Sequence, residues 1–300
     1  MKRIIVGLSV MLAATPAGAG QRDSSTGVLL LAHGGQPEWN ERVVSVATGV
    51  DQQYPTEIAF GMASRASIQG AVDRLAQRGV TSIVAVPLFV SSHSSVITST
   101  AFLLGLRSVA PADLKLFAKM NHASHGAAAD LGDDQAPADP ASPVSSRLPI
   151  RMTPALNGHP LVGQVVVDRA RSISTSPGDE AVILVAHGPV PEDDNRRWLD
   201  DMAKVAAQVR TAVPFASVDY LTVRDDAGTV IKEAATRELR SKVEQQRALG
   251  RRVLVVPHLL SFGGIEQGLR KRLEGLAYTM TAQALMPDDR IVQWVLASVR

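Results

Sequence analysis

The chain has 300 residues, of which 45% are hydrophobic and 20% are charged, and its formal net charge is only +2. This composition predicts an ordinary globular protein with a substantial buried core. The small net charge, together with aromatic side chains at only 4% of the residues, argues against a nucleic-acid-binding surface. The absence of cysteine excludes disulfides and thiolate metal sites.

The N-terminus resembles an export signal. Lys2 and Arg3 precede an apolar run over residues 4–14, and the small residues Ala17-Gly18-Ala19 follow. The run is too short for an ordinary transmembrane helix. We therefore expect residues 1–19 to be a cleaved signal peptide and the protein to be periplasmic or secreted, with no stable membrane span after cleavage. An uncleaved anchor is the alternative.

The sequence contains an internal repeat. The segment VLLLAHG at residues 28–34 returns as VILVAHG at residues 182–188, and VPLFVS at residues 86–91 returns as VPHLLS at residues 256–261. A weaker third block pairs Met152-Thr153 with Met280-Thr281. Because the blocks keep the same order in both halves, the sequence indicates a duplication.

Each half alternates short apolar runs with helical patterns. Residues 28–32 and 83–86 are continuously apolar, as expected of parallel strands that are covered on both faces. Apolar residues with helical spacing lie between them at Ile68, Ala71, Val72 and Leu75. This pattern predicts an α/β fold with two tandem doubly wound lobes, residues 26–178 and 179–300. Each lobe is expected to contain a four-stranded parallel sheet of order 2-1-3-4, flanked by helices.

The first half carries about 40 extra residues between the second and third repeat blocks. The surplus is rich in Ala, Asp, Pro, Ser and Gly, which predicts a disordered surface insert over about residues 113–147. Within it, His122 and His125 are candidates for metal scavenging, although the sequence does not define their role.

The candidate site centres on two histidines of the first lobe. His33 follows the first strand and precedes Gly34-Gly35, whereas His93 follows the third strand. In a 2-1-3-4 sheet these strands are neighbours, and ligands bind beyond their carboxyl ends. We therefore expect His33 and His93 to share a divalent metal, with coordination positions left open for substrate. A structural role for each histidine is the alternative.

The second lobe keeps only part of this pair. His187 corresponds to His33, but Gly263 occupies the position of His93. His187 and Glu38 are candidate cleft-lining residues. Alternatively, Glu38 and Glu192 interact favourably with the positive N-terminal ends of the helices that follow. His258 lies within a predicted strand, where a hydrogen-bonded buried histidine is expected, and His159 is expected to fix a turn.

Taken in order, these motifs are similar to those of the sirohydrochlorin cobaltochelatase and ferrochelatase family, the class II chelatases, in a two-lobed form. The resemblance covers nearly the whole mature chain. It rests mainly on Leu31-Ala32-His33-Gly34 with Pro37-Glu38, on residues 86–90 (VPLFV) leading to His93, and on residues 257–261 (PHLLS). The chain departs from the family pattern at Gly35 and at Ser91-Ser92.

The resemblance implies insertion of a divalent metal into a sirohydrochlorin-like tetrapyrrole without ATP or another nucleotide. The metal is a substrate, expected to be Co²⁺, with Fe²⁺ and Ni²⁺ as alternatives. His33 and His93 would bind it and accept protons from the pyrrole nitrogens. A second hypothesis is an exported metal- or tetrapyrrole-binding protein without turnover. A third, a phosphoryl-transfer histidine enzyme, is disfavoured because Ala32 stands where an arginine is expected before the histidine.

Overall fold

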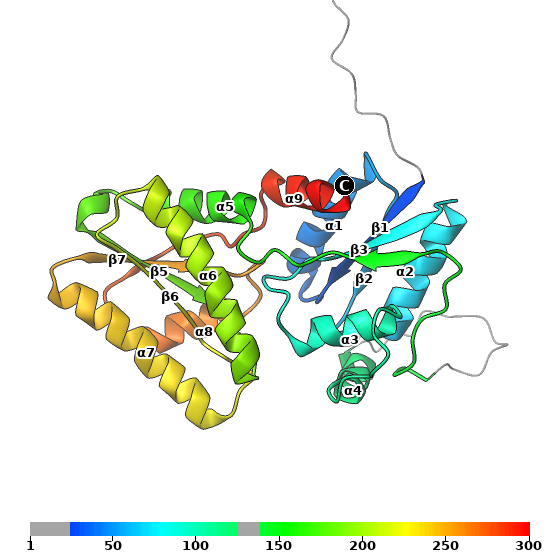
Figure 1. Ribbon diagram of the computed structural model, residues 1–300. Coiled ribbons are helices and arrows are strands. Elements are labelled where there is room, and N and C mark those ends of the chain that lie inside the picture. Colours follow the sequence, from blue (N-terminus) through cyan, green and yellow to red (C-terminus); the bar gives the residue numbers. More distant parts are fainter. Residues whose placement is uncertain (1–24, 125–138) are drawn as a thin grey trace, which may run out of the picture.

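The computed structural model describes residues 25–124 and 139–300, which form two α/β lobes (Figure 1). The predicted signal peptide and His125 lie outside the described residues. The first lobe contains β1 (Thr26–Ala32), α1 (Pro37–Asp51), β2 (Thr56–Phe60), α2 (Arg65–Gln77), β3 (Ser82–Pro87), α3 (Ser95–Leu103), α4 (Leu114–Ser124) and β4 (Ile150–Met152). Then follow α5 (Pro160–Arg171), a 3₁₀ turn (Pro177–Asp179), β5 (Glu180–Ala186), α6 (Glu192–Ala212), β6 (Ser217–Thr222), α7 (Thr229–Ala248), β7 (Arg252–Pro257), α8 (Ile265–Arg272), β8 (Thr279–Met280) and α9 (Asp289–Val299).

Both sheets are parallel and have the same topology. Their strand orders are β2-β1-β3-β4 and β6-β5-β7-β8, which confirms the predicted order and fold class. The central strands pair in equivalent registers, with Leu31 opposite Pro87 in one lobe and Val185 opposite Pro257 in the other. Continuous burial over residues 28–32 of β1 and 181–186 of β5 explains why these runs are apolar at every position rather than at alternate ones.

The lobes exchange a helix. α5 follows the last strand of the first sheet but packs against α6 and β7, whereas α9, at the end of the chain, packs against α1 and β3 (Figure 1). One hydrophobic cluster accordingly contains residues of both sheets, among them Leu30 and Leu184, together with Trp294 of α9. The predicted division at residue 178 separates the two sheets, but these two helices cover the sheet of the opposite half.

The described residues of the extra segment, 113–124 and 139–147, are ordered, which corrects for these residues the prediction of a disordered insert over 113–147. Residues 114–124 form α4, because Leu114 and Phe117 are one turn apart and bury their side chains in the core beside α2 and α3. Nearer β4, backbone carbonyls of Ser142 and Ser145 accept hydrogen bonds from Arg65 and Gln69 of α2. The amino-acid composition of the segment gave no indication of these contacts.

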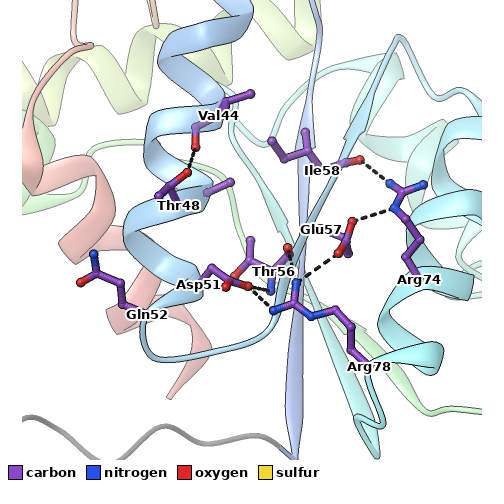
Figure 2. Close-up of a pocket in the computed structure, with 10 residues that line it drawn as sticks. Val44, Thr48, Asp51, Gln52, Thr56, Glu57, Ile58, Arg74 and Arg78 are labelled. Atoms are coloured by element: carbon purple, nitrogen blue, oxygen red, sulfur yellow. Dashed lines mark hydrogen bonds and ion pairs between the residues drawn. The ribbon is translucent and has the colours of Figure 1, made fainter.

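The outer strand β2 is protected by Arg74 of α2 and by Arg78, which follows the last residue of that helix. Arg74 donates to the carbonyl of Ile58 and Arg78 to that of Thr56, and both also pair with Glu57 (Figure 2). They border a surface depression of about 650 Å³. Because these cations bond edge-strand carbonyls and a carboxylate, we interpret the depression as a covered sheet edge and not as a ligand site.

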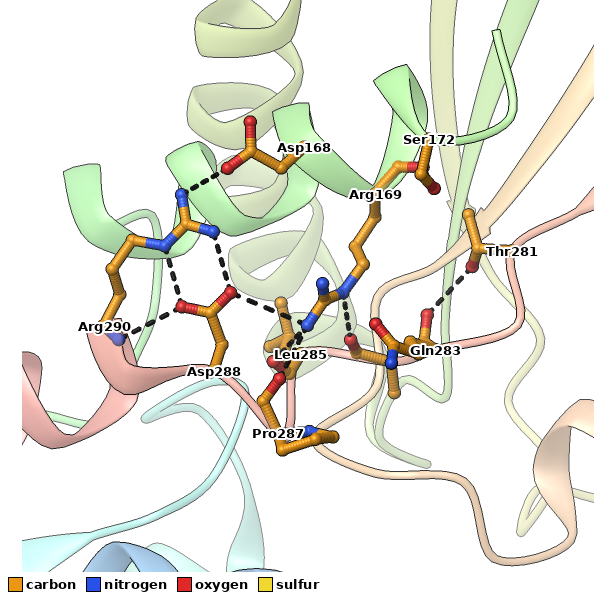
Figure 3. Close-up of polar contacts among 10 residues, drawn as sticks. Asp168, Arg169, Ser172, Thr281, Gln283, Leu285, Pro287, Asp288 and Arg290 are labelled. Atoms are coloured by element: carbon orange, nitrogen blue, oxygen red, sulfur yellow. Dashed lines mark hydrogen bonds and ion pairs between the residues drawn. The ribbon is translucent and has the colours of Figure 1, made fainter. Parts of the chain in front are cut away.

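A charged cluster fastens the segment before α9 to α5 (Figure 3). Arg169 donates to the carbonyls of Ala284, Leu285 and Pro287. Arg290 pairs with Asp168 and Asp288, and Asp288 also caps α9 by accepting from the backbone of Arg290. The exchange of helices is therefore held by side-chain bonds as well as by apolar packing.

This cluster predicts an acid-sensitive contribution to stability. Burial alone would raise the pKa of Asp288, but hydrogen bonds from Arg290 and the charges of Arg290 and Arg169 outweigh it and lower that pKa from 3.8. Because the pKa is lower in the folded state, Asp288 stabilises the protein above about pH 4, and the contribution is lost as pH falls through the folded pKa. We expect Asp288→Asn to be less stable at pH 7 and to lose less stability on acidification, measured by urea unfolding. Identical acid dependence in both proteins would contradict this prediction.

Candidate functional site in the cleft between the lobes

A cavity of about 910 Å³ lies between the lobes, beyond the carboxyl ends of the central strands. This volume is at the upper end of the ~300–1,000 Å³ typical of small-molecule sites. Its walls are largely apolar and come from both halves of the chain, including Trp39, Leu88, Phe89, Trp198, Leu259 and Leu260. The cavity therefore suits a large ligand with apolar faces.

His33 lines this cleft from the first lobe. The chain turns sharply after β1 at Gly34, whose φ of +82° favours glycine. The side chain of Asn40, in the first turns of α1, fixes the loop through two hydrogen bonds with the backbone of Gly35, at 2.8 and 3.1 Å.

The hydrogen bonding of His33 determines its tautomer. Its Nδ1 lies 2.7 Å from the carbonyl oxygen of Gly34, which can only accept a hydrogen bond. Nδ1 must therefore carry the proton, and in the neutral ring Nε2 keeps a free electron pair. The ring is exposed at the cleft, so Nε2 can accept a proton or bind a metal there.

His187 occupies the equivalent position in the second lobe and lines the same cleft. It precedes Gly188, whose φ is +76°, and a Cβ at Gly188 would lie 2.5 Å from the Cβ of Thr222. Only glycine fits this turn. The Nε2 of His187 lies 3.5 Å from Oδ2 of Asp226, an exposed carboxylate that also lines the cleft.

His93 is held differently. Its neighbours Ser91 and Ser94 line the cleft, but His93 is not among the lining residues. Its side chain is 33% exposed and its Nε2 lies 4.0 Å from Oδ2 of Asp201 on α6, while its carbonyl accepts a 2.6 Å hydrogen bond from Trp198. The structure therefore does not bring His93 into the cleft with His33, and their shared metal site stays a prediction. Among the described residues, no group of three or more His, Cys, Asp or Glu is arranged to hold a metal ion.

His258 is buried, as expected, but its Nδ1 has no hydrogen-bond partner. The expectation of a hydrogen-bonded histidine was therefore wrong. Its equivalent in the first lobe is Leu88, which is also buried at the cleft wall. Burial lowers the pKa of His258 to about 4, so the ring is neutral at pH 7.

We expect His258→Leu, which copies the residue of the first lobe, to stabilise the fold by about 1 kcal/mol, because it removes an unsatisfied buried nitrogen. The pKa of His258 lies below its ordinary 6.5 in the folded state. The free energy of unfolding of the wild type is therefore highest above about pH 6.5, and it decreases as pH falls towards 4, because the unfolded state then binds a proton that the folded state does not. Urea unfolding at pH 5 and pH 8 should show a larger gain for the variant at pH 5. An equal gain at both pH values would contradict the prediction.

The remaining predicted residues lie outside the cleft lining. Glu38 is exposed in the first turn of α1, where it faces the positive helix end. Glu192 pairs with Arg224. His159 caps α5, because its Nδ1 accepts from the backbone of Leu161 at 3.2 Å, which confirms the expectation of a turn-fixing role. The side chain of His122 lies outside the described residues.

Sequence reasoning missed the aromatic and α4 residues of the cleft. Trp39 and Trp198 line it from α1 and α6, and Leu116 and Phe117 line it from α4. The apolar run Leu114-Lys115-Leu116-Phe117 was the available signal, but the polar composition of the surrounding segment outweighed it.

The two repeated α/β lobes, with a His-Gly turn from each at a shared cleft, have the architecture of class II chelatases. Residues 27–173, from β1 to just past α5, match the sequence model of the CbiX family. The first half of the chain, including His33 and His93, therefore matches this family of class II chelatases.

Solved structures agree on the fold. The structure of SirB from Bacillus subtilis with Fe³⁺ is 15% identical and superposes with a TM-score of 0.59, covering 92% of this chain and 94% of that chain. DR2241 from Deinococcus radiodurans, a multi-domain protein with structural similarity to chelatases, is 18% identical with a TM-score of 0.53. That match covers 92% of this chain but 55% of DR2241. The comparison with curated proteins found no match.

Proposed function

We propose that this protein is a metal chelatase that inserts Co²⁺, or alternatively Fe²⁺, into a sirohydrochlorin-like tetrapyrrole without ATP. The observation that carries the proposal is the free Nε2 of His33 at a large cleft with apolar walls. The match of residues 27–173 to the CbiX family model supports the reaction class.

Metal insertion requires a proton acceptor beside the macrocycle. As the metal forms bonds to the pyrrole nitrogens, the two pyrrole N–H protons must leave, so two protons are released for each metal ion inserted. One passes to the Nε2 of His33 once the metal has left that electron pair for the macrocycle, because the Nδ1–H of His33 is already bonded to Gly34, and the other passes to water. The apolar walls exclude water from the macrocycle faces, and the metal enters as a substrate from solution.

The second histidine of the proposed metal pair is His93. Its loop borders the cleft through Ser91 and Ser94, and the pair requires the imidazole to leave Asp201 for a side-chain rotamer that faces the cleft. Imidazole binds several divalent ions, and the order of affinities does not by itself select cobalt. We propose Co²⁺ as the preferred metal, and competition between Co²⁺, Fe²⁺ and Ni²⁺ at equal concentrations tests that choice.

The function is tested by anaerobic incubation of the purified protein with metal-free sirohydrochlorin and Co²⁺. We expect multiple turnovers, followed by the absorbance change of the macrocycle, at a rate well above that of metal and macrocycle alone. ATP should have no effect. Stoichiometric binding of metal or macrocycle without insertion would overturn the proposal and favour a carrier protein.

We further propose that the protein acts outside the cytoplasm after cleavage of residues 1–19. Among the described helices, none combines the length and hydropathy needed to cross a bilayer. Cell fractionation and N-terminal sequencing test the proposal, and a cytoplasmic protein that retains Met1 would contradict it.

A further inference from the structure

The mouth of the cleft carries two exposed apolar side chains that face it from different lobes. Leu116 on α4 is 56% exposed, and Val190 on the loop between β5 and α6 is 45% exposed. Both line the cleft. A ligand bound in the cleft would cover both side chains, and burying their apolar surface would favour its binding.

Both residues are held in place by buried neighbours. Leu114 and Phe117, which are 1% and 5% exposed, anchor α4 in the core and leave Leu116 on a different side of the helix. In the second lobe, the buried side chain of Arg224 donates to the backbone carbonyls of Pro189 and Val190. The two apolar groups are therefore fixed features of the cleft mouth.

The charges of the lining restrict how a ligand lies there. Among the described residues that line the cleft, the carboxylates Asp113 and Asp226 are present, and lysine and arginine are absent. A tetrapyrrole is a flat ring with apolar faces and carboxylates on its periphery. Carboxylates brought beside Asp113 and Asp226 would meet like charge, whereas the ring faces would cover apolar walls.

We propose that Leu116 and Val190 form an apolar clamp that holds the faces of the tetrapyrrole between the lobes, with its carboxylates directed out of the cleft. This inference rests on the proposed function, since it takes the macrocycle as the ligand. It assigns a substrate-positioning role to α4, a helix in the connection that is longer in the first lobe than in the second. Leu116 and Val190 bind the ring and leave the proton transfer to other residues.

The test compares Leu116→Ser and Val190→Ser with Leu106→Ser and Val109→Ser. The last two replace side chains that are 45% and 67% exposed but do not line the cleft. We expect each clamp variant to raise the KM for sirohydrochlorin about tenfold, corresponding to ~1.4 kcal/mol, with less than about a twofold change in kcat and in the KM for Co²⁺. The control variants should match the wild type. Because all four sites are exposed, thermal unfolding should show that every variant folds.

A second readout does not depend on turnover. Trp39 and Trp198 line the cleft, so binding of metal-free sirohydrochlorin should quench their fluorescence, and the clamp variants should bind about tenfold more weakly than the wild type. If the wild type binds the macrocycle without inserting metal, the proposed reaction fails, but weaker binding by the clamp variants still supports the clamp. Clamp variants that bind and turn over like the wild type would overturn the clamp alone. A wild type that does not bind the macrocycle would overturn both.

Discussion

Replacing His33 with alanine is expected to reduce kcat for metal insertion by at least ~100-fold, the usual loss when a positioned proton acceptor is removed. The reason lies in the turn after β1. There the Gly34 carbonyl fixes the proton on Nδ1 and leaves Nε2 free at the cleft. Alanine offers no acceptor, so pyrrole protons would have to pass to water in a cleft whose walls are largely apolar.

The assay is single-turnover insertion of Co²⁺ into sirohydrochlorin at saturating macrocycle, so that weaker binding does not disguise the result. The matched control is His159→Asn, which removes an imidazole outside the cleft lining and keeps a side chain that can cap α5. It should retain full activity. If His33→Ala is fully active and His187→Ala is not, the proton acceptor lies in the second lobe and the assignment to His33 is wrong.

Trp294→Ala is expected to cost about 3–5 kcal/mol of the free energy of unfolding, the range for truncation of a large buried aromatic side chain. Trp294 is 2% exposed on α9 and belongs to the hydrophobic cluster that both lobes share. Its removal leaves a cavity where α9 packs on the first lobe. The effect should therefore reach the sheet that carries His33, although Trp294 lies more than 250 residues further along the chain.

Urea unfolding followed by far-ultraviolet circular dichroism measures this loss without relying on tryptophan fluorescence. Trp294→Phe should lose less, because more of the cavity stays filled. Leu249→Ala, at a side chain that is 65% exposed, should change stability by less than about 0.5 kcal/mol. A loss of under about 1 kcal/mol for Trp294→Ala would show that the site refills and that α9 contributes little to the core.

Much of the fold could be predicted because the local patterns were strong. Uninterrupted apolar runs at β1 and β5 identified buried parallel strands, and the repeated VP motif located β3 and β7. The His-Gly turns then followed from the rule that sites form beyond strand ends. These inferences needed only neighbours in sequence and the regular geometry of parallel sheets.

The remaining features depend on contacts between distant segments. The sequence of α5 does not indicate which of the two sheets the helix covers, because its apolar face would fit either one. Residue spacing placed His93 at the correct strand end but could not give its rotamer, which the structure directs towards Asp201 on the opposite lobe. His258 was misjudged for a related reason, since hydrogen-bond partners of a buried ring depend on packing.

The exchanged helices also affect what counts as a folding unit. The segment that matches the CbiX family, residues 27–173, carries α5, which serves the second sheet, and lacks α9, which covers the first. If the chain were cut at residue 178, the first half would expose the apolar surfaces of α1 and β3 to water and carry a helix with nothing to pack on. The halves thus resemble a domain-swapped dimer joined into one polypeptide, and they should unfold together in one transition.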